Sequence, residues 1–182
     1  MKSAININLF GGPGVGKSRT AAAVFDRLKM LGKKVDMTQE FAKELVYSED
    51  WFRLSDQLLV AGEQHHRMYR LLNKVDYAVH DSPFIMGMSY CCETKIPIAE
   101  FNAYLKEQFN RYNNVNILLR RNKEALYEEY GREQDLEGAK LLDDTIAHLL
   151  MKNSIPYIVV DVDDGTIDHI ISIATMPLEY KS

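Results

Sequence analysis

Apolar residues follow two different spacings along this 182-residue chain, and the two spacings alternate from end to end. Between residues 4 and 10, isoleucine and leucine alternate with asparagine, which is typical of a strand. From Lys17 onward, apolar residues recur every three or four positions as far as Leu31, and Gly32 suits a C-terminal cap. The chain therefore opens with a strand, a glycine-rich turn and a helix.

The same alternation continues through the rest of the chain. Further strands are expected at residues 34–37, 77–80, 115–119 and 157–160. Further helices are expected near 40–47, from an N-cap at Ser55 to about 72, and over 98–109, 135–151 and 167–174. In the helix after Ser55, the predicted buried face consists of Leu58, Ala61, His65, Met68 and Leu72. Strands that alternate with helices favour an α/β fold with a five-stranded, mostly parallel sheet covered on both faces.

Two positions fit this sheet poorly. The first strand should be central and buried on both faces, yet it carries Asn6 and Asn8. A buried amide without a hydrogen bond is costly. We therefore expect both asparagines to find partners or to lie on a partly open face.

The glycine-rich turn satisfies the pattern G-x-x-x-x-G-K-S/T. Its glycines let backbone N–H groups curl around phosphate oxygens, and the following helix adds the positive end of its dipole. This P-loop is expected to bind ATP through Gly11, Gly12, Pro13, Gly14, Val15, Gly16, Lys17 and Ser18. Within it, Lys17 should reach the β- and γ-phosphates, and the Ser18 hydroxyl should bind Mg2+.

Two carboxylates are expected at the same edge of the sheet as the P-loop. Asp81 follows the third strand, and the carboxyl ends of parallel strands are where ligands bind. Asp81 is therefore a candidate Mg2+ ligand, although Asp-Ser-Pro is also ordinary turn chemistry. Glu40 follows the second strand, where it could orient an acceptor hydroxyl or take its proton. A solvated carboxylate at a helix N-terminus is an equally good explanation of Glu40.

Three arginines flank a polar segment that follows the fourth strand. Arg120, Arg121 and Arg132 border about a dozen residues without apolar periodicity. Long loops in compact domains often act as lids. We expect a lid over about residues 120–134, with Arg120 binding nucleotide and Arg121 and Arg132 neutralising charge during phosphoryl transfer.

Composition and charge indicate the class of protein and the compartment in which it works. An apolar content of 46% and a charged content of 26% are normal for one globular domain over residues 1–182. The net charge of −4 provides no overall basic field for nucleic acid. Cys91 and Cys92 are neighbours and are expected to be reduced thiols in a cytoplasm. No segment approaches the roughly 18 apolar residues of a membrane helix.

With these motifs, the chain resembles the nucleoside and nucleotide kinase branch of P-loop proteins. It is similar to small AAA-type ATPases and kinases akin to nicotinamide riboside kinase and thymidylate kinase, many of them encoded by bacteriophages. The resemblance is based on the P-loop, the run from Glu40 to Glu44, and Asp81-Ser82-Pro83. Residues 119–121 and 130–134 resemble the opening and the tip of a lid.

The resemblance implies a P-loop three-layer sandwich, ATP with Mg2+, and an acceptor site between the second strand and the helix after Ser55. It implies a kinase of nucleotide metabolism, in a host cytoplasm if the gene belongs to a phage. The acceptor is a nucleoside, a nucleotide, or hydroxymethyluracil within DNA, and a homodimer stays open. Related kinases usually carry Asp-Arg where this chain has Asp81-Ser82, so their arginine-assisted step does not follow from the resemblance.

Other nucleotide-dependent functions compete with a kinase. Residues 73–76 match the N-K-x-D motif of GTPases, but they follow a helix instead of a strand. A ring-forming ATPase requires a glutamate directly after Asp81, where this chain has Ser82. An ATP-dependent regulatory module that transfers no phosphate also stays open. We therefore expect a phosphotransferase, with a non-kinase ATPase or a regulatory module as the alternative.

Overall fold

A computed structural model describes residues 4–90, 98–121 and 136–176. Its centre is one sheet in the order β2-β3-β1-β4-β5, and every neighbouring pair of strands is parallel. The strands are β1 (Ile5–Phe10), β2 (Val35–Thr38), β3 (Tyr77–Asp81), β4 (Asn113–Arg120) and β5 (Ile158–Asp161). The predicted five-stranded α/β fold is confirmed.

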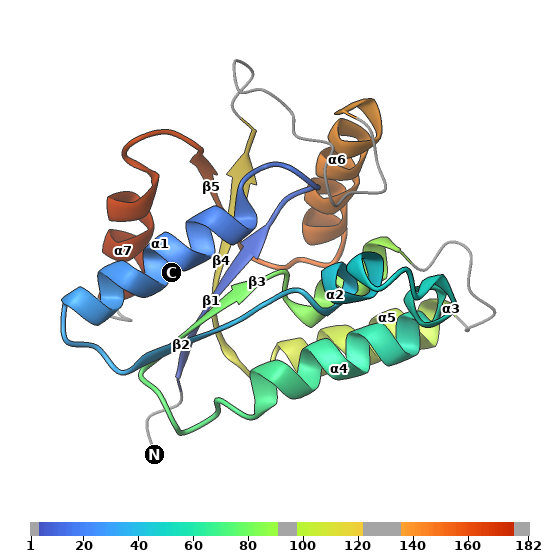
Figure 1. Ribbon diagram of the computed structural model, residues 1–182, viewed down its shortest axis with the longest axis horizontal. Helices are drawn as coiled ribbons and strands as arrows, with labels where there is room; N and C mark the ends of the chain where they lie inside the picture. Colours follow the sequence, from blue (N-terminus) through green and yellow to red (C-terminus); the bar gives the residue numbers. More distant parts are fainter. Residues whose placement is uncertain (1–3, 91–97, 122–135, 177–182) are drawn as a thin grey trace.

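Helices cover both faces of the sheet (Figure 1). One face carries α1 (Lys17–Met30) and α7 (Thr166–Thr175). The opposite face carries α4 (Gln57–Tyr69), the 3-10 helix η1 (Phe84–Ser89), α5 (Ile98–Phe109) and α6 (Leu136–Lys152). The short helices α2 (Phe41–Tyr47) and α3 (Trp51–Ser55) contact α4. Three layers result, as the strand and helix pattern predicts.

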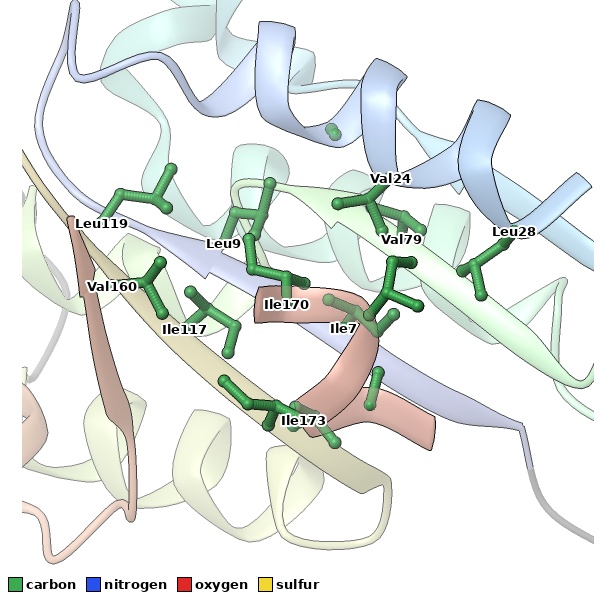
Figure 2. Packing of buried hydrophobic residues seen from close by; sticks show 14 of the residues in the cluster. Ile7, Leu9, Val24, Leu28, Val79, Ile117, Leu119, Val160, Ile170 and Ile173 are labelled. Atoms are coloured by element: carbon green, nitrogen blue, oxygen red, sulfur yellow. The ribbon is translucent and has the colours of Figure 1, made fainter. Parts of the chain in front are cut away.

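The alternating residues of β1 separate two cores. Ile7 and Leu9 are fully buried against α1 and α7, together with the aliphatic side chains that Figure 2 shows. On the other face, Phe10 joins an aromatic core in which it meets Phe109 edge-on at 6.3 Å between ring centroids. Burial of each such side chain stabilises the fold by about 1.5–3 kcal/mol. The two cores hold the carboxyl end of β1, and with it the P-loop, between layers of helices.

Asn8 finds its partners on β4. Its Nδ2 donates to the side-chain oxygens of two asparagines, at 2.9 Å in each case: Asn114 and Asn116. Asn116 in turn donates to the carbonyl of Pro156 at 2.9 Å. The expectation of hydrogen bonding is confirmed for the NH2 group of Asn8, whereas Asn8 Oδ1 is buried without a hydrogen-bond partner among the described residues.

Asn6 finds its partner on β3. Its Oδ1 lies 2.9 Å from His80 Nε2, and its Nδ2 donates to the Ala4 carbonyl at 3.0 Å. Because Asn6 Oδ1 can only accept, His80 Nε2 donates and His80 Nδ1 accepts from the Thr38 hydroxyl at 2.8 Å. Burial lowers the pKa of His80 to about 3. A neutral histidine therefore links β2, β3 and β1 beneath their carboxyl ends.

Two local expectations are wrong. Ser55 does not cap the helix that follows it; Asp56 does, accepting hydrogen bonds from Leu58 N and Leu59 N. Leu58 is 58% exposed, whereas Gln64 on the same helix is 5% exposed. The polar residues Gln57 and Gln64 belong to the buried face because they hydrogen-bond to neighbouring backbone.

The helices η1 and α3 have no counterpart in the predicted elements. Elements this short give too few residues for an apolar period to show. None of the helices within the described ranges combines the length and the apolar composition that a membrane span requires.

Candidate nucleotide and phosphoryl-transfer site

The P-loop turns sharply between β1 and α1. Gly11, Gly14 and Gly16 have φ values of 141°, 74° and 103°, which side-chain-bearing residues rarely adopt. Gly16 is the N-cap of α1, and no acidic residue lies in the first turn of this helix. The first N–H groups and the positive dipole end of α1 are therefore available to an anion, without a competing carboxylate in the first turn of the helix.

Lys17 is held over the loop that precedes it. Its Nζ donates to the carbonyls of Gly11 at 2.8 Å and Gly12 at 3.2 Å, and the residue is 8% exposed. Ser18 is exposed in the first turn of the same helix. The ammonium group is thus placed beside the loop before any ligand arrives.

Asp81 lies at the same sheet edge. It is the last residue of β3 and pairs with Leu9 of β1. The residue is 3% exposed, and its Oδ1 is buried with no hydrogen-bond partner within the described residues. An ionised oxygen in such a place requires a cation or a donor. Ser82 follows with φ of 68°, a left-handed conformation that is rare for serine and common at functional sites.

Glu40 joins this group from the end of β2, where it is the N-cap residue of α2. Burial raises the pKa of Glu40 above its usual value of 4.5, the nearby Lys17 opposes this shift, and the negative charge of Asp81 adds to it. Lys17 and Asp81 are thus both close enough to Glu40 to influence its charge. The structure therefore brings together the sequence-predicted residues Lys17, Glu40 and Asp81.

Gln64 of α4 fixes the backbone on both sides of Glu40. Its Oε1 accepts from Phe41 N at 2.9 Å, and its Nε2 donates to Gln39 O at 3.2 Å. Next to it, Arg67 pairs with Glu44 at 2.6 Å and lies over the Phe41 ring, 4.9 Å from its centroid. Helices α2 and α4 thus position the turn that carries Glu40.

The two described arginines of the predicted lid have different partners. Arg121 Nε donates to Asp143 Oδ2 at 2.9 Å, and Arg121 Nη2 donates to the Pro13 carbonyl at 2.8 Å. Arg120 is exposed and forms an ion pair with Asp161, which lowers the pKa of that carboxyl. Arg132 and residues 122–134 of the predicted lid lie outside the described residues. Of the two described arginines, Arg121 is thus the one that lies against the P-loop.

Sequence reasoning missed Asp143, Gln64 and His80 as parts of the site. Asp143 lies in the first half of α6, on a helix predicted only for its apolar face. Gln64 and His80 are buried polar residues, and Gln64 was not part of the predicted buried face of its helix. The one clue in the sequence was the mismatch of asparagines on β1, which required polar partners from neighbouring strands.

A Mg2+ ion usually takes one or two protein oxygens together with phosphate oxygens and water. Ser18 and the unpartnered oxygen of Asp81 fit that pattern. No group of three or more His, Cys, Asp or Glu side chains that could hold a metal occurs among residues 4–90, 98–121 and 136–176. The donor set therefore suits a metal that arrives with the nucleotide.

Several solved structures share this fold. A deoxyadenosine kinase from M. mycoides with dCMP and dCDP bound matches with a TM-score of 0.55 and 17% identity, over 92% of this chain and 97% of that chain. The NadR protein in complex with NR matches with a TM-score of 0.71 and 14% identity, over 100% of this chain. The chain spans 54% of NadR. At these identities the likeness shows the fold.

Sequence comparison gives the family. No curated protein matches the chain. The AAA domain family matches residues 6–166, a range that contains the P-loop, Glu40, Asp81, Arg121 and Asp143. With most of its length matched, including the strand and the turn that build the phosphate-binding loop, this chain belongs to the AAA domain family.

Proposed function

We propose that this protein is an ATP- and Mg2+-dependent phosphotransferase. It moves the γ-phosphoryl group of ATP to a hydroxyl or phosphate of a nucleoside, a nucleotide, or a hydroxymethylated pyrimidine in DNA. The observation that supports this most strongly is the meeting of a shaped P-loop with Lys17, Glu40 and Asp81 at one sheet edge.

The donor nucleotide would bind along the P-loop. Backbone N–H groups of residues 11–18 and the α1 dipole would hold its phosphates, and Lys17 would reach the β- and γ-phosphates. Lys17 already lies against the loop, so little side-chain freedom is lost on binding. Arg120 is the last residue of β4 and Arg121 follows it directly, so both lie at the same sheet edge as the loop. A lid over residues 120–134 that includes Arg132 belongs to this proposal.

Ser18 and Asp81 would hold Mg2+. The ion would bridge phosphate oxygens and neutralise the charge that develops as the phosphoryl group leaves ADP. Asp81 suits this role because its unpartnered oxygen is buried beside the loop.

Glu40 would act on the acceptor. The acceptor oxygen attacks the γ-phosphorus in line, the bond from the γ-phosphorus to the β,γ-bridging oxygen breaks, and ADP leaves. Glu40 would orient an acceptor hydroxyl and take its proton, leaving a phosphate ester as product. Its raised pKa brings this carboxylate closer to neutral pH, where a general base works well.

The solved structures with this fold support a nucleoside or nucleotide acceptor. The M. mycoides deoxyadenosine kinase structures contain dCMP, dCDP, dCTP or dATP, and NadR structures contain NR, NAD or AMP-PNP. Each ligand is a nucleoside or a nucleotide. We extend this class of ligand to this chain because the fold is shared and because charged groups meet at the sheet edge.

The test is phosphate uptake from labelled ATP by three acceptor classes: nucleosides, nucleoside monophosphates and hydroxymethylated DNA. Uptake that requires Mg2+ and is lost in Lys17→Ala, with an unchanged circular dichroism spectrum, is the expected result. ATP hydrolysis that no acceptor stimulates would instead favour a non-kinase ATPase. ATP binding without turnover would favour a regulatory module, and equal binding of GTP would reopen the role of residues 73–76.

A further inference from the structure

We propose that Asp143 is a positioning residue that joins the first turn of the P-loop to Arg121. This inference rests on the proposed phosphotransferase function for its kinetic consequence. Its geometric part concerns the free protein and can be tested without any substrate.

Asp143 uses both of its carboxylate oxygens. Oδ1 accepts from the backbone N–H of Gly12 at 2.6 Å, and Oδ2 accepts from Arg121 Nε at 2.9 Å. Arg121 closes the ring by donating from Nη2 to the Pro13 carbonyl at 2.8 Å. Three elements are thus joined by three hydrogen bonds: the P-loop, the end of β4 and helix α6.

The ion pair in this ring is shielded from water. The side chains of Arg121 and Asp143 are 14% and 23% exposed, whereas Arg120 and Asp161 next to them are 66% and 55% exposed. A partly buried pair is screened less by solvent and salt, and the loss of one partner leaves a buried charge uncompensated. The Asp143 pair is therefore the one of the two that can set a side-chain position.

Gly12 shows that the loop and α6 lie too close for a side chain. A Cβ on Gly12 would lie 2.6 Å from the Ala139 carbonyl oxygen and 2.7 Å from Asp143 Oδ1. The P-loop pattern leaves this position unspecified. Contact with α6 explains the second glycine of the loop, which phosphate binding alone does not require.

Gly12 is also held on its other side. Its carbonyl accepts from Lys17 Nζ at 3.2 Å, while its N–H donates to Asp143. One loop residue thus connects Lys17 to Asp143, and through Asp143 to Arg121. We infer that α6 sets the relative position of the two cations that the proposed mechanism uses.

The experiment compares two substitutions at Asp143 with one at its neighbour. Asp143→Asn keeps an oxygen for Gly12 N–H but turns an N–H donor toward Arg121, and Asp143→Ala removes both contacts. Asp144 is exposed on the same helix, so Asp144→Asn is the matched control for lost charge.

For the free protein, we expect Asp143→Ala to speed hydrogen exchange of the Gly12 amide by about tenfold or more, with Asp144→Asn unchanged. Exchange at the wild-type rate in Asp143→Ala would overturn the inference, whatever the enzyme assays give. A wild-type protein that binds no triphosphate would refute the proposed function and leave this result standing.

For turnover, we expect Asp143→Asn to lower kcat by about tenfold or more while KM for ATP changes less than about threefold. Asp143→Asn should add little in an Arg121→Gln background, because the two residues act as one unit. Equal turnover of Asp143→Asn and Asp144→Asn would overturn the positioning role. If the two variants have equal melting temperatures, a general loss of stability is excluded as the cause of the difference in turnover.

Discussion

Gln64 accepts a hydrogen bond from the backbone N–H of Phe41 at 2.9 Å, across the contact between α4 and α2. The same side chain donates to the Gln39 carbonyl at 3.2 Å. Glu40, the carboxylate assigned to the acceptor, lies between these two backbone contacts. Gln64 thus fixes the turn that carries Glu40, the residue that we propose acts on the acceptor.

Gln64→Glu tests this contact. The carboxylate can still accept from Phe41 N–H, but it cannot donate to the Gln39 carbonyl and places a negative charge beside Glu40. A buried acceptor left without a donor costs about 1–3 kcal/mol. We expect turnover with the acceptor to fall about tenfold or more while ATP affinity stays close to wild type, measured by kinetics and calorimetry. Gln108→Glu, the same change on α5, is the control, and equal turnover of the two variants would contradict the prediction.

Glu40→Gln should stabilise the protein at neutral pH. Burial raises the pKa of Glu40, so the folded state binds its proton more tightly than the unfolded state does. Stability from this group is then lost as pH rises from about 4.5 through the folded-state pKa, and glutamine, which stays neutral, avoids the loss. Urea unfolding at about pH 7 should give a higher midpoint for the variant.

Glu44→Gln should have the opposite effect on stability at neutral pH. Hydrogen bonds from Arg67 lower the pKa of Glu44, so its contribution is present above about pH 4.5 and is lost at lower pH. We expect Glu44→Gln to lower the midpoint in the same experiment. A lowered midpoint for Glu40→Gln would show that its burial costs no stability.

The acid side of the pH–rate profile should report Glu40. If Glu40 takes the acceptor proton, it must be ionised, and its raised pKa moves the loss of activity above the usual pH of about 4.5. We expect kcat/KM to fall with decreasing pH through an apparent pKa above that value. Glu40→Gln should lower kcat sharply and abolish this dependence. A variant that keeps the wild-type acid limb would remove Glu40 from the proton transfer.

The carboxyl edge of the sheet was predictable because parallel strands end together. Lys17, Asp81 and Glu40 each follow or end a strand whose alternation shows in the sequence, and the structure brings them within electrostatic reach of one another. Arg121 was expected to act from a lid. The structure places it against Asp143, which is 22 positions away in the chain, and against Pro13, which is 108 positions away.

The polar interior was not predictable residue by residue. His80 lies in a predicted strand and Gln64 lies outside the predicted buried face of its helix, and each is buried with a specific hydrogen-bond partner. Leu58 was expected inside and is 58% exposed, since the α4 face that meets α2 is the one with Gln64. The hydropathy pattern predicts how much of an element is buried. Which polar side chains are buried depends on hydrogen-bond partners from other parts of the chain.

His80→Gln should flatten the acid dependence of stability. Folding holds His80 neutral, with a pKa of about 3 against 6.5 when unfolded, so stability is full above pH 6.5 and falls as pH drops toward 3. This group contributes a loss of at most about 1.4 kcal/mol per pH unit in that window. Chemical denaturation at about pH 6.5 and about pH 4.5 should show a smaller difference for the variant than for wild type. His148→Gln shows the effect of losing an exposed imidazole, and an equal slope in all three proteins would refute the prediction.

Two glycines offer opposite outcomes from the same substitution. Gly62 lies on the exposed side of α4, and a methyl group added to it would meet nothing within 4 Å, so Gly62→Ala should stabilise the helix by about 0.5–1 kcal/mol.

Gly12→Ala places its methyl group against backbone of α6, at 2.6 Å from the Ala139 oxygen, and must displace either the loop or the helix. We expect Gly12→Ala to lower the melting temperature by several degrees, since about 1–3 kcal/mol of overpacking is typical, and to weaken triphosphate binding. Thermal unfolding and calorimetry of the pair provide the measurement. A Gly12→Ala protein that melts with wild type would mean that α6 moves freely against the loop, and the close contact of Asp143 with Gly12 would then have no energetic weight.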